Sequence, residues 1–178
     1  VILAAKDTVT LKSGSLIDAQ GPAQAESDDA THYETAGEGA LVRAAATPAD
    51  FTRTASPPGI LITRGTLVGE AGSKVIAADS ITLDATRDNA FKGVVEFNKE
   101  GAAVAGNLAV GATRINFGAA PTGSEGITYS QAGLDALNSL ESMVLTSYST
   151  FDLYGDVNVG GVDINGKPTL QNLTLLGA

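Results

Sequence analysis

The side chains of this sequence with the richest chemistry gather in segment 21–38. That segment holds Asp28, Asp29, Glu34 and the only histidine of the chain, His32. An imidazole beside carboxylates could bind a metal ion, but one histidine among acids is a weak donor set, and no cysteine is present to add thiolates. We therefore predict no metal site. These four residues remain candidates for contact with a ligand.

Two overlapping loop motifs follow near the end of the chain. From Gly161 to Lys167 the glycine and lysine spacing matches a phosphate-binding loop, but Pro168 stands where that loop needs Ser or Thr to hold Mg²⁺. Asp156 begins a stretch that resembles a calcium loop, but Lys167 occupies the twelfth position, where a carboxylate should complete the ion's shell. The sequence predicts a turn here and no cofactor.

Catalytic arrangements find little support in the sequence. Polysaccharide hydrolases use a pair of carboxylates, and Asp152, Asp156 and Asp163 are the acids that fall in or near expected strands. A glycan-active enzyme therefore stays as an alternative, but we assign no catalytic residues. Tyr148 and Tyr154 are candidates for a ligand platform, although alternation along a strand would send some aromatic side chains into the core.

The composition narrows the class of protein. The chain has 178 residues, 43% of them apolar, and a net charge of −9. This acidity argues against a nucleic-acid partner. No cysteine is present, which excludes disulfides. The length suits a single domain, and we interpret the whole of 1–178 as one segment of a longer chain.

Short runs of alternating or apolar residues, separated by Gly, Asp, Asn and Ser, are typical of strands. They predict strands near Val9–Leu11, Ser15–Asp18, Ala40–Arg43, Ile60–Thr63, Thr66–Val68, Lys74–Ala77, Ile81–Leu83, Val94–Phe97, Asn107–Val110, Arg114–Phe117, Ile127–Tyr129, Met143–Tyr148, Phe151–Leu153, Val157–Val159, Val162–Ile164 and Leu170–Leu175.

The strand runs also resemble one another. A Gly-x-Leu-(Ile/Val) start recurs at Gly14, Gly39 and Gly65, and the stretch from Lys74 aligns with the stretch from Leu108. Such periods indicate a β-solenoid, and at ~22 residues per coil the chain would make about eight coils. The rival is an antiparallel sandwich, which would favour two-residue Asn-Gly or Asp-Gly hairpins. Of these the chain has only the one at Asn165.

Three stretches interrupt the strand pattern. Segments of about 21–38 and 44–58 are polar or rich in Ala, Thr and Pro, and we expect them to project as loops. Leu134, Leu137 and Leu140 fall on one helical face behind a potential N-cap, Ser130. They predict a short helix over about 131–141.

Several stretches together resemble the interior modules of filamentous-haemagglutinin-like large exoproteins. The resemblance rests on the run from Leu108 to Pro121, the run from Gly126 to Ser130, the leucine-bearing helical segment, and the run from Leu145 to Val157. The starts at Gly39 and Gly65 are similar to the preceding part of such a module.

The resemblance implies a right-handed parallel β-helix in the shaft of a secreted adhesin at the bacterial cell surface. It also implies export with an outer-membrane secretion partner and a role in attachment or biofilm. The family's shaft carries no catalytic residues, so none are transferred. Potential partners are a glycan or host-surface ligand, and other copies of the chain added head to tail as a matrix filament. A phage tail or spike module is a further alternative.

Overall fold

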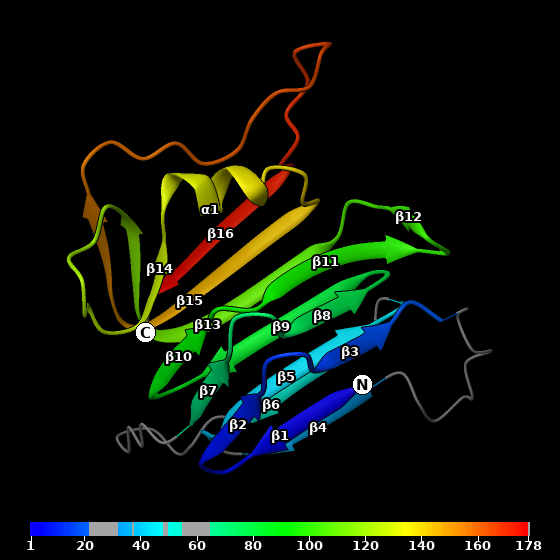
Figure 1. The fold of residues 1–178 in the computed structure, drawn as a ribbon, viewed down its shortest axis with the longest axis vertical. Helices are drawn as coiled ribbons and strands as arrows, with labels where there is room; N and C mark the ends of the chain where they lie inside the picture. The colour runs from blue at the N-terminus through cyan, green and yellow to red at the C-terminus, as the bar shows by residue number, and fades with distance from the viewer. Residues whose placement is uncertain (22–31, 37, 48–49, 55–64, 178) are drawn as a thin grey trace.

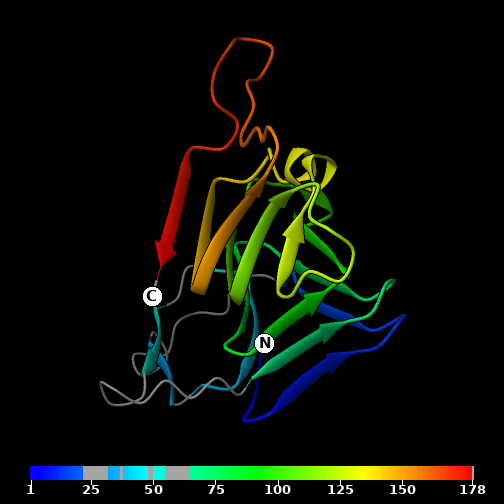
Figure 2. The ribbon, with the colours of Figure 1, turned by 90° about the vertical axis from the view of Figure 1, so that its left-hand side faces the viewer.

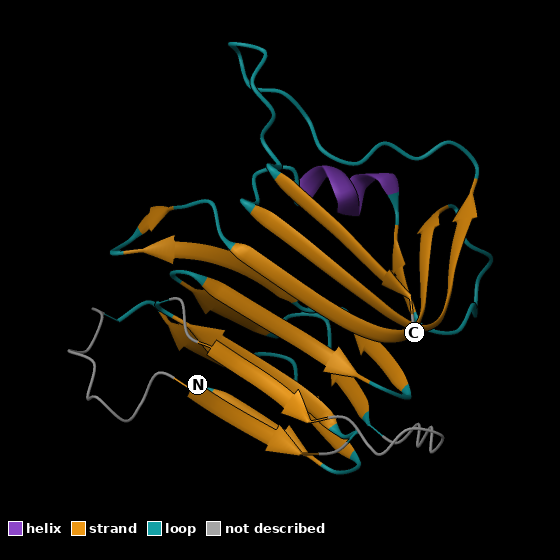
Figure 3. Ribbon diagram, turned by 180° about the vertical axis from the view of Figure 1, so that it is seen from behind, coloured by secondary structure: helices purple, strands orange, loops and turns teal. Residues whose placement is uncertain are grey.

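The computed structural model describes residues 1–21, 32–36, 38–47, 50–54 and 65–177. Most of the described chain forms strands, with one short helix at one end (Figure 3). The elements are β1 Ile2–Ala5, β2 Thr8–Leu11, β3 Leu16–Ala19, β4 His32–Ala36, β5 Ala40–Ala45, β6 Asp50–Thr54, β7 Thr66–Gly69, β8 Lys74–Ala77, β9 Ser80–Ala85, β10 Asp88–Phe91, β11 Val94–Lys99, β12 Ala102–Ala103, β13 Asn107–Gly118, β14 Ile127–Tyr129, α1 Gln131–Ala136, β15 Ser142–Tyr154 and β16 Asn172–Gly177.

Three sheets surround a common core (Figures 1 and 2). Sheet A has the order β1-β5-β9-β13-β15-β16, with β14 also paired to β13. Sheet B is β10-β7-β2, and sheet C is β12-β11-β8-β3. The chain visits B, C and A in that order through β7, β8 and β9, and again through β10, β11 and β13. Each return places a strand parallel to its predecessor, so successive passes stack on one another.

The stacking produces continuous apolar columns on the inner face of sheet A. One column follows the strand register through Leu3, Val42, Leu83, Val110, Leu145 and Leu175. Its four inner members are at most 2% exposed, whereas Leu3 is 39% and Leu175 50% exposed. Full burial of such a side chain contributes about 1.5–3 kcal/mol, so the column is a main source of stability.

Sheet A departs from a uniformly parallel arrangement at one strand. β5 lies between β1 and β9 and is antiparallel to both. β1 therefore runs in the same direction as β9. Val42 and Ala44 of β5 are fully buried, so the inner apolar columns continue through this strand. The expectation of wholly parallel strands is wrong at this position, although the all-β class is confirmed.

The sequence repeats that we aligned do not follow the structural register. Gly14 precedes β3, which pairs with β8, whereas Gly65 precedes β7 in a different sheet. Lys74 pairs with Val94 and not with Leu108. Each coil of a solenoid would contribute one strand to sheet B. That sheet contains three described strands, whereas about eight coils were expected. The resemblance between strands reflects their shared alternation, which leaves the register weakly specified.

Some predicted elements also differ in extent. The stretches Val157–Val159 and Val162–Ile164 are not strands, apart from a single bridge between Val162 and Pro168. The expected strand Ile60–Thr63 lies outside the described residues. Within the expected loops 21–38 and 44–58, residues 32–36 form β4 and residues 50–54 form β6, and these two strands pair in parallel.

The predicted helix begins as expected but is shorter. Ser130 is the N-cap, and its hydroxyl accepts a hydrogen bond from the Gly133 N–H at 3.2 Å. The helix ends at Ala136. Beyond it, the N–H groups of Leu137 and Leu140 donate to carbonyls only three residues earlier, as in a 3₁₀ turn. Leu134 and Leu140 are buried, so the predicted apolar face does pack on the core.

Candidate functional site

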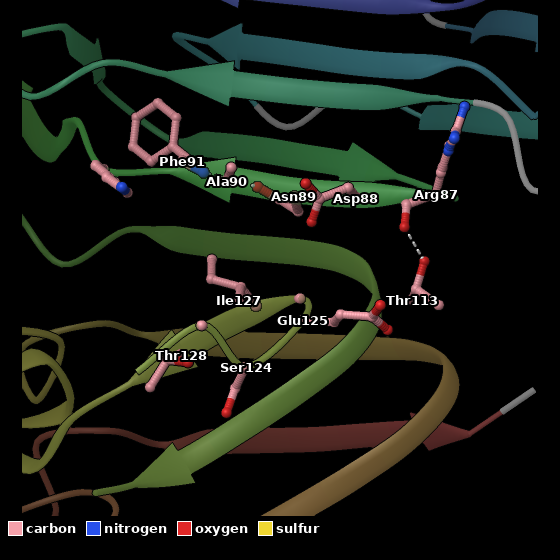
Figure 4. A pocket seen from close by; sticks show the side chains of 13 residues that line it. Arg87, Asp88, Asn89, Ala90, Phe91, Thr113, Ser124, Glu125, Ile127 and Thr128 are labelled. Carbon is pink, nitrogen blue, oxygen red and sulfur yellow. Dashed lines mark hydrogen bonds between the residues drawn. The ribbon is translucent and has the colours of Figure 1, made fainter. Parts of the chain in front are cut away.

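A groove of about 720 Å³ lies between β10 and the segment 123–128, which includes the start of β14. Figure 4 shows the residues of β10 along one wall and Ser124, Glu125, Ile127 and Thr128 along the other. β10 is the edge strand of sheet B, because its only described partner is β7. β14 pairs with β13. The groove is therefore bounded by two strand edges.

The backbone of β10 is paired with β7 along one of its two edges. The N–H groups of Asp88 and Lys92 donate to Gly65 and Gly69, on the side of β7. Since successive residues of a strand point their N–H and C=O to opposite edges, those of Asn89 and Phe91 point away from β7. Asn89 is 0% exposed, so its backbone groups are covered and not open to the groove. The Phe91 N–H donates to the Asn89 Oδ1 of its own strand at 3.3 Å. The remaining groups have no ladder partner among the described residues.

The groove opens where β13 bends. The pairing of β13 with β15 shifts register between Ala112 and Arg114. The side chain of Asn89, which is fully buried, crosses to this bend, and its Nδ2 donates to the carbonyls of Leu83 at 3.1 Å and Gly111 at 3.0 Å. A polar side chain therefore stands in an otherwise apolar column because it satisfies carbonyls at the bend.

A hydroxyl closes one end of the groove. Thr113 Oγ1 donates to the carbonyl of Thr86 at 2.8 Å and to that of Arg87, the bond drawn in Figure 4. On the other side of the bend, Ser147 Oγ bonds the carbonyls of Thr113 at 3.1 Å and Thr150 at 2.6 Å. Together these hydroxyls fix the path of β13 relative to β10 and β15.

The walls of the groove have two kinds of surface. The inner part includes Phe91, which is half-buried, and Ile127, which is buried in the core. The rim carries the exposed side chains of Arg87, Lys92 and Glu125. The groove thus offers an apolar floor with charges of both signs above it.

Half of the candidate ligand contacts predicted in segment 21–38 lie outside the described residues. Asp28 and Asp29 are among those. His32 and Glu34 lie on β4, where their backbones pair with Asp50 and Thr52 of β6.

The predicted tyrosine contacts lie on β15. Tyr148 is half-buried at the bend, and its hydroxyl donates to Asp84 Oδ1 at 2.8 Å. Tyr154 is half-buried at the end of the strand. The neighbouring aromatic rings are stacked. The ring centroid of Phe117 lies 6.2 Å from that of Phe151 and 6.3 Å from that of Tyr129. Burial raises the pKa of Tyr129. Phe117 belongs to the core, and Tyr129 and Phe151 pack against it.

Two of the three acids that we considered for catalysis, Asp152 and Asp163, make structural contacts. Asp152 contacts Arg114 at 3.3 Å and accepts from Thr150 at 3.1 Å. The Asp163 carboxylate accepts the N–H groups of Asn165 and Lys167 at 2.8 and 2.9 Å, and these hydrogen bonds lower its pKa. The described part of the chain contains no group of three or more His, Cys, Asp or Glu residues that could hold a metal ion.

No pattern in the sequence predicted the groove. Its residues belong to no motif, because the groove is defined by the position of strand edges. One signal was present: Asn89 and Asp88 occupy a strand whose partners at those positions are Leu67 and Thr66. An inward-facing asparagine in a strand indicates carbonyls that need a donor.

Among the described residues, no helix is both long enough and apolar enough to cross a membrane. Comparisons with models of protein families, with curated proteins and with solved structures find no match to this chain.

Proposed function

We propose that this chain is a non-catalytic shaft segment of a secreted adhesin at the bacterial cell surface. In this proposal the stacked passes form a right-handed parallel β-helix into which β5 is inserted. Parallel strands joined by crossovers in one sheet are almost always right-handed, which supports that hand here. The resemblance of several stretches to filamentous-haemagglutinin-like exoproteins supports the role and suggests export with an outer-membrane secretion partner.

The observation that carries the proposal is the open column of sheet A. Leu3 and Leu175 are its two end members, and both are exposed although they stand in register with fully buried neighbours. β1 and β16 also run in the same direction, since β5 is antiparallel to both of its neighbours. Further coils could thus be added at either end with the same chemistry, as a shaft requires.

The engagement of the acidic side chains favours a shaft over a glycan-cleaving enzyme. A retaining or inverting glycosidase needs two carboxylates facing a shared sugar site. Asp152 is instead paired with Arg114, and Asp163 stabilises a turn. Segment 21–38 carries four of the predicted ligand-contact residues, Asp28, Asp29, His32 and Glu34, and is the first candidate for recognition.

Binding to immobilised glycans and host-matrix proteins tests the adhesive role. The purified chain is compared with a variant lacking residues 22–38 and with a charge variant, Asp28→Asn with Asp29→Asn. We expect saturable binding that both variants lose. Absence of binding by the parent chain contradicts an adhesive role for this segment, and release of reducing ends from a glycan would establish the enzyme alternative.

A self-assembling filament is a second candidate, favoured by the same exposed column ends. Leu175 lies in the inner column at 50% exposure, and Leu176 points to the opposite face at 49% exposure. Head-to-tail addition would cover Leu175 but not Leu176. Leu175→Lys should therefore abolish concentration-dependent growth in sedimentation velocity, whereas Leu176→Lys should retain it. A parent chain that stays monomeric at high concentration rules this candidate out.

A further inference from the structure

The connection between β15 and β16 contains a small hairpin that projects beyond α1 (Figure 1). Val162 and Pro168 form an antiparallel bridge in this hairpin. Nearer its tip, the Asp163 N–H donates to the Lys167 carbonyl at 2.8 Å. The tip is therefore the turn that runs from Asp163 to Lys167.

This turn contains the only Asn-Gly pair of the chain, Asn165 and Gly166. Such a pair can react with itself. The backbone nitrogen of the glycine bonds to the side-chain carbonyl carbon of the asparagine, and the side-chain amide leaves as ammonia with the proton of that nitrogen. Water then opens the succinimide ring to give aspartate or isoaspartate. Glycine favours the reaction because no Cβ hinders the attacking nitrogen.

Asp163 binds both of the groups that would react. The Gly166 N–H, whose nitrogen would attack, donates to the Asp163 carbonyl at 2.9 Å. The Asn165 side-chain amide, which would leave, donates to the Asp163 carboxylate. That carboxylate also accepts the backbone N–H groups of Asn165 and Lys167, at 2.8 and 2.9 Å. The backbone is therefore held on both sides of the glycine.

The surroundings of the turn leave these bonds as its main restraint. Asn165 and Gly166 are both exposed to water, and a Cβ added at Gly166 would meet no described atom within 4 Å. Gly166 has a φ of 75°, which glycine adopts without strain. The turn thus favours glycine at the position that makes the asparagine reactive, and the Asp163 bonds oppose that reactivity.

We infer that Asn165 is a site of spontaneous deamidation that Asp163 holds in an unreactive turn. Deamidation then proceeds from molecules in which the turn has opened, and the Asp163 bonds keep that population small. Isoaspartate adds one methylene group to the backbone path, so a modified hairpin can no longer pair Asp163 with Lys167 in the same register. The inference goes beyond the proposed shaft role and does not depend on it.

The test compares deamidation in the whole chain, in Asp163→Ala and in a synthetic peptide of residues 160–170, all incubated at neutral pH. The peptide supplies the rate of an unprotected pair. Asp156→Ala is the matched control, because it removes another exposed acid from the same connection. Mass spectrometry of proteolytic fragments measures the change in mass at Asn165, and circular dichroism checks that each variant keeps its strands.

We expect deamidation to be at least about tenfold slower in the parent chain than in the peptide, because only opened molecules react. Asp163→Ala should react several-fold faster than the parent chain, and Asp156→Ala should match the parent. Asn158, which precedes a valine, should stay intact in every sample. An unreactive peptide overturns the site itself. Equal rates in the parent chain and the peptide, or in the parent chain and Asp163→Ala, overturn the role of Asp163.

Discussion

The inner column of sheet A allows one substitution to be compared at two positions. Leu145 and Leu175 are direct neighbours in the parallel register of β15 and β16. Leu145 is 0% exposed and Leu175 is 50% exposed. Replacing each by alanine therefore removes the same atoms from a closed and from an open part of one column.

The two substitutions should differ clearly in cost. Leu145→Ala leaves a cavity in a packed core, and such changes cost about 2–5 kcal/mol. Leu175→Ala removes a half-exposed side chain and leaves no closed cavity, so about half of the ~1.5–3 kcal/mol transfer value applies. We expect Leu145→Ala to lower the free energy of unfolding by ~2 kcal/mol more than Leu175→Ala does.

Urea unfolding followed by circular dichroism measures both losses. With slopes of about 1–3 kcal/mol per molar urea, a 2 kcal/mol gap separates the midpoints by roughly 1 M. The experiment is run at low protein concentration, so that head-to-tail contacts do not cover Leu175. Equal losses would refute the reasoning, because they would mean that Leu175 is as well covered as Leu145.

Further predictions concern the bend, the helix and the core tyrosine. Tyr148→Phe removes the bond to Asp84 and should cost ~1 kcal/mol in urea unfolding. Gly111→Ala forces a Cβ against the Asp84 carboxylate and should cost more than Tyr148→Phe in the same assay. Ser130→Ala should cost ~1 kcal/mol and speed amide exchange at Gly133. The raised pKa of Tyr129 keeps its phenol protonated in the folded state. The stability linked to this protonated phenol is fully present below about pH 10, the pKa of an unfolded tyrosine, and it is lost as the pH rises above that value. In alkali, the Tyr129→Phe variant should therefore lose less stability than the parent chain.

Local strand positions could be predicted from the sequence because alternation is a local property. The predicted strands Lys74–Ala77 and Ile127–Tyr129 coincide with β8 and β14. The N-cap at Ser130 was also predictable, since it depends on one hydroxyl at the start of an apolar repeat.

Strand order and direction could not be predicted in the same way. The apolar and small residues of β5 fit an antiparallel or a parallel neighbour equally well. The reversed direction of β5 could therefore not be predicted from its residue pattern. The register depends on corners such as Gly14, whose N–H donates to Gly72 at 3.1 Å, with both residues at positive φ. The groove depends in turn on that register, which is why it was not foreseen.

Disulfide trapping tests the stacked register most directly, because the chain has no cysteine of its own. Thr10 and Val68 are register partners on adjacent parallel strands, whereas Thr10 and Ala90 are separated by β7. Adjacent strands lie ~4.8 Å apart, and a disulfide needs Cα atoms about 4.4–6.8 Å apart. The account predicts that Thr10→Cys with Val68→Cys oxidises readily, and that Thr10→Cys with Ala90→Cys stays reduced. Rapid oxidation of the second pair and none of the first would contradict the stack of coils.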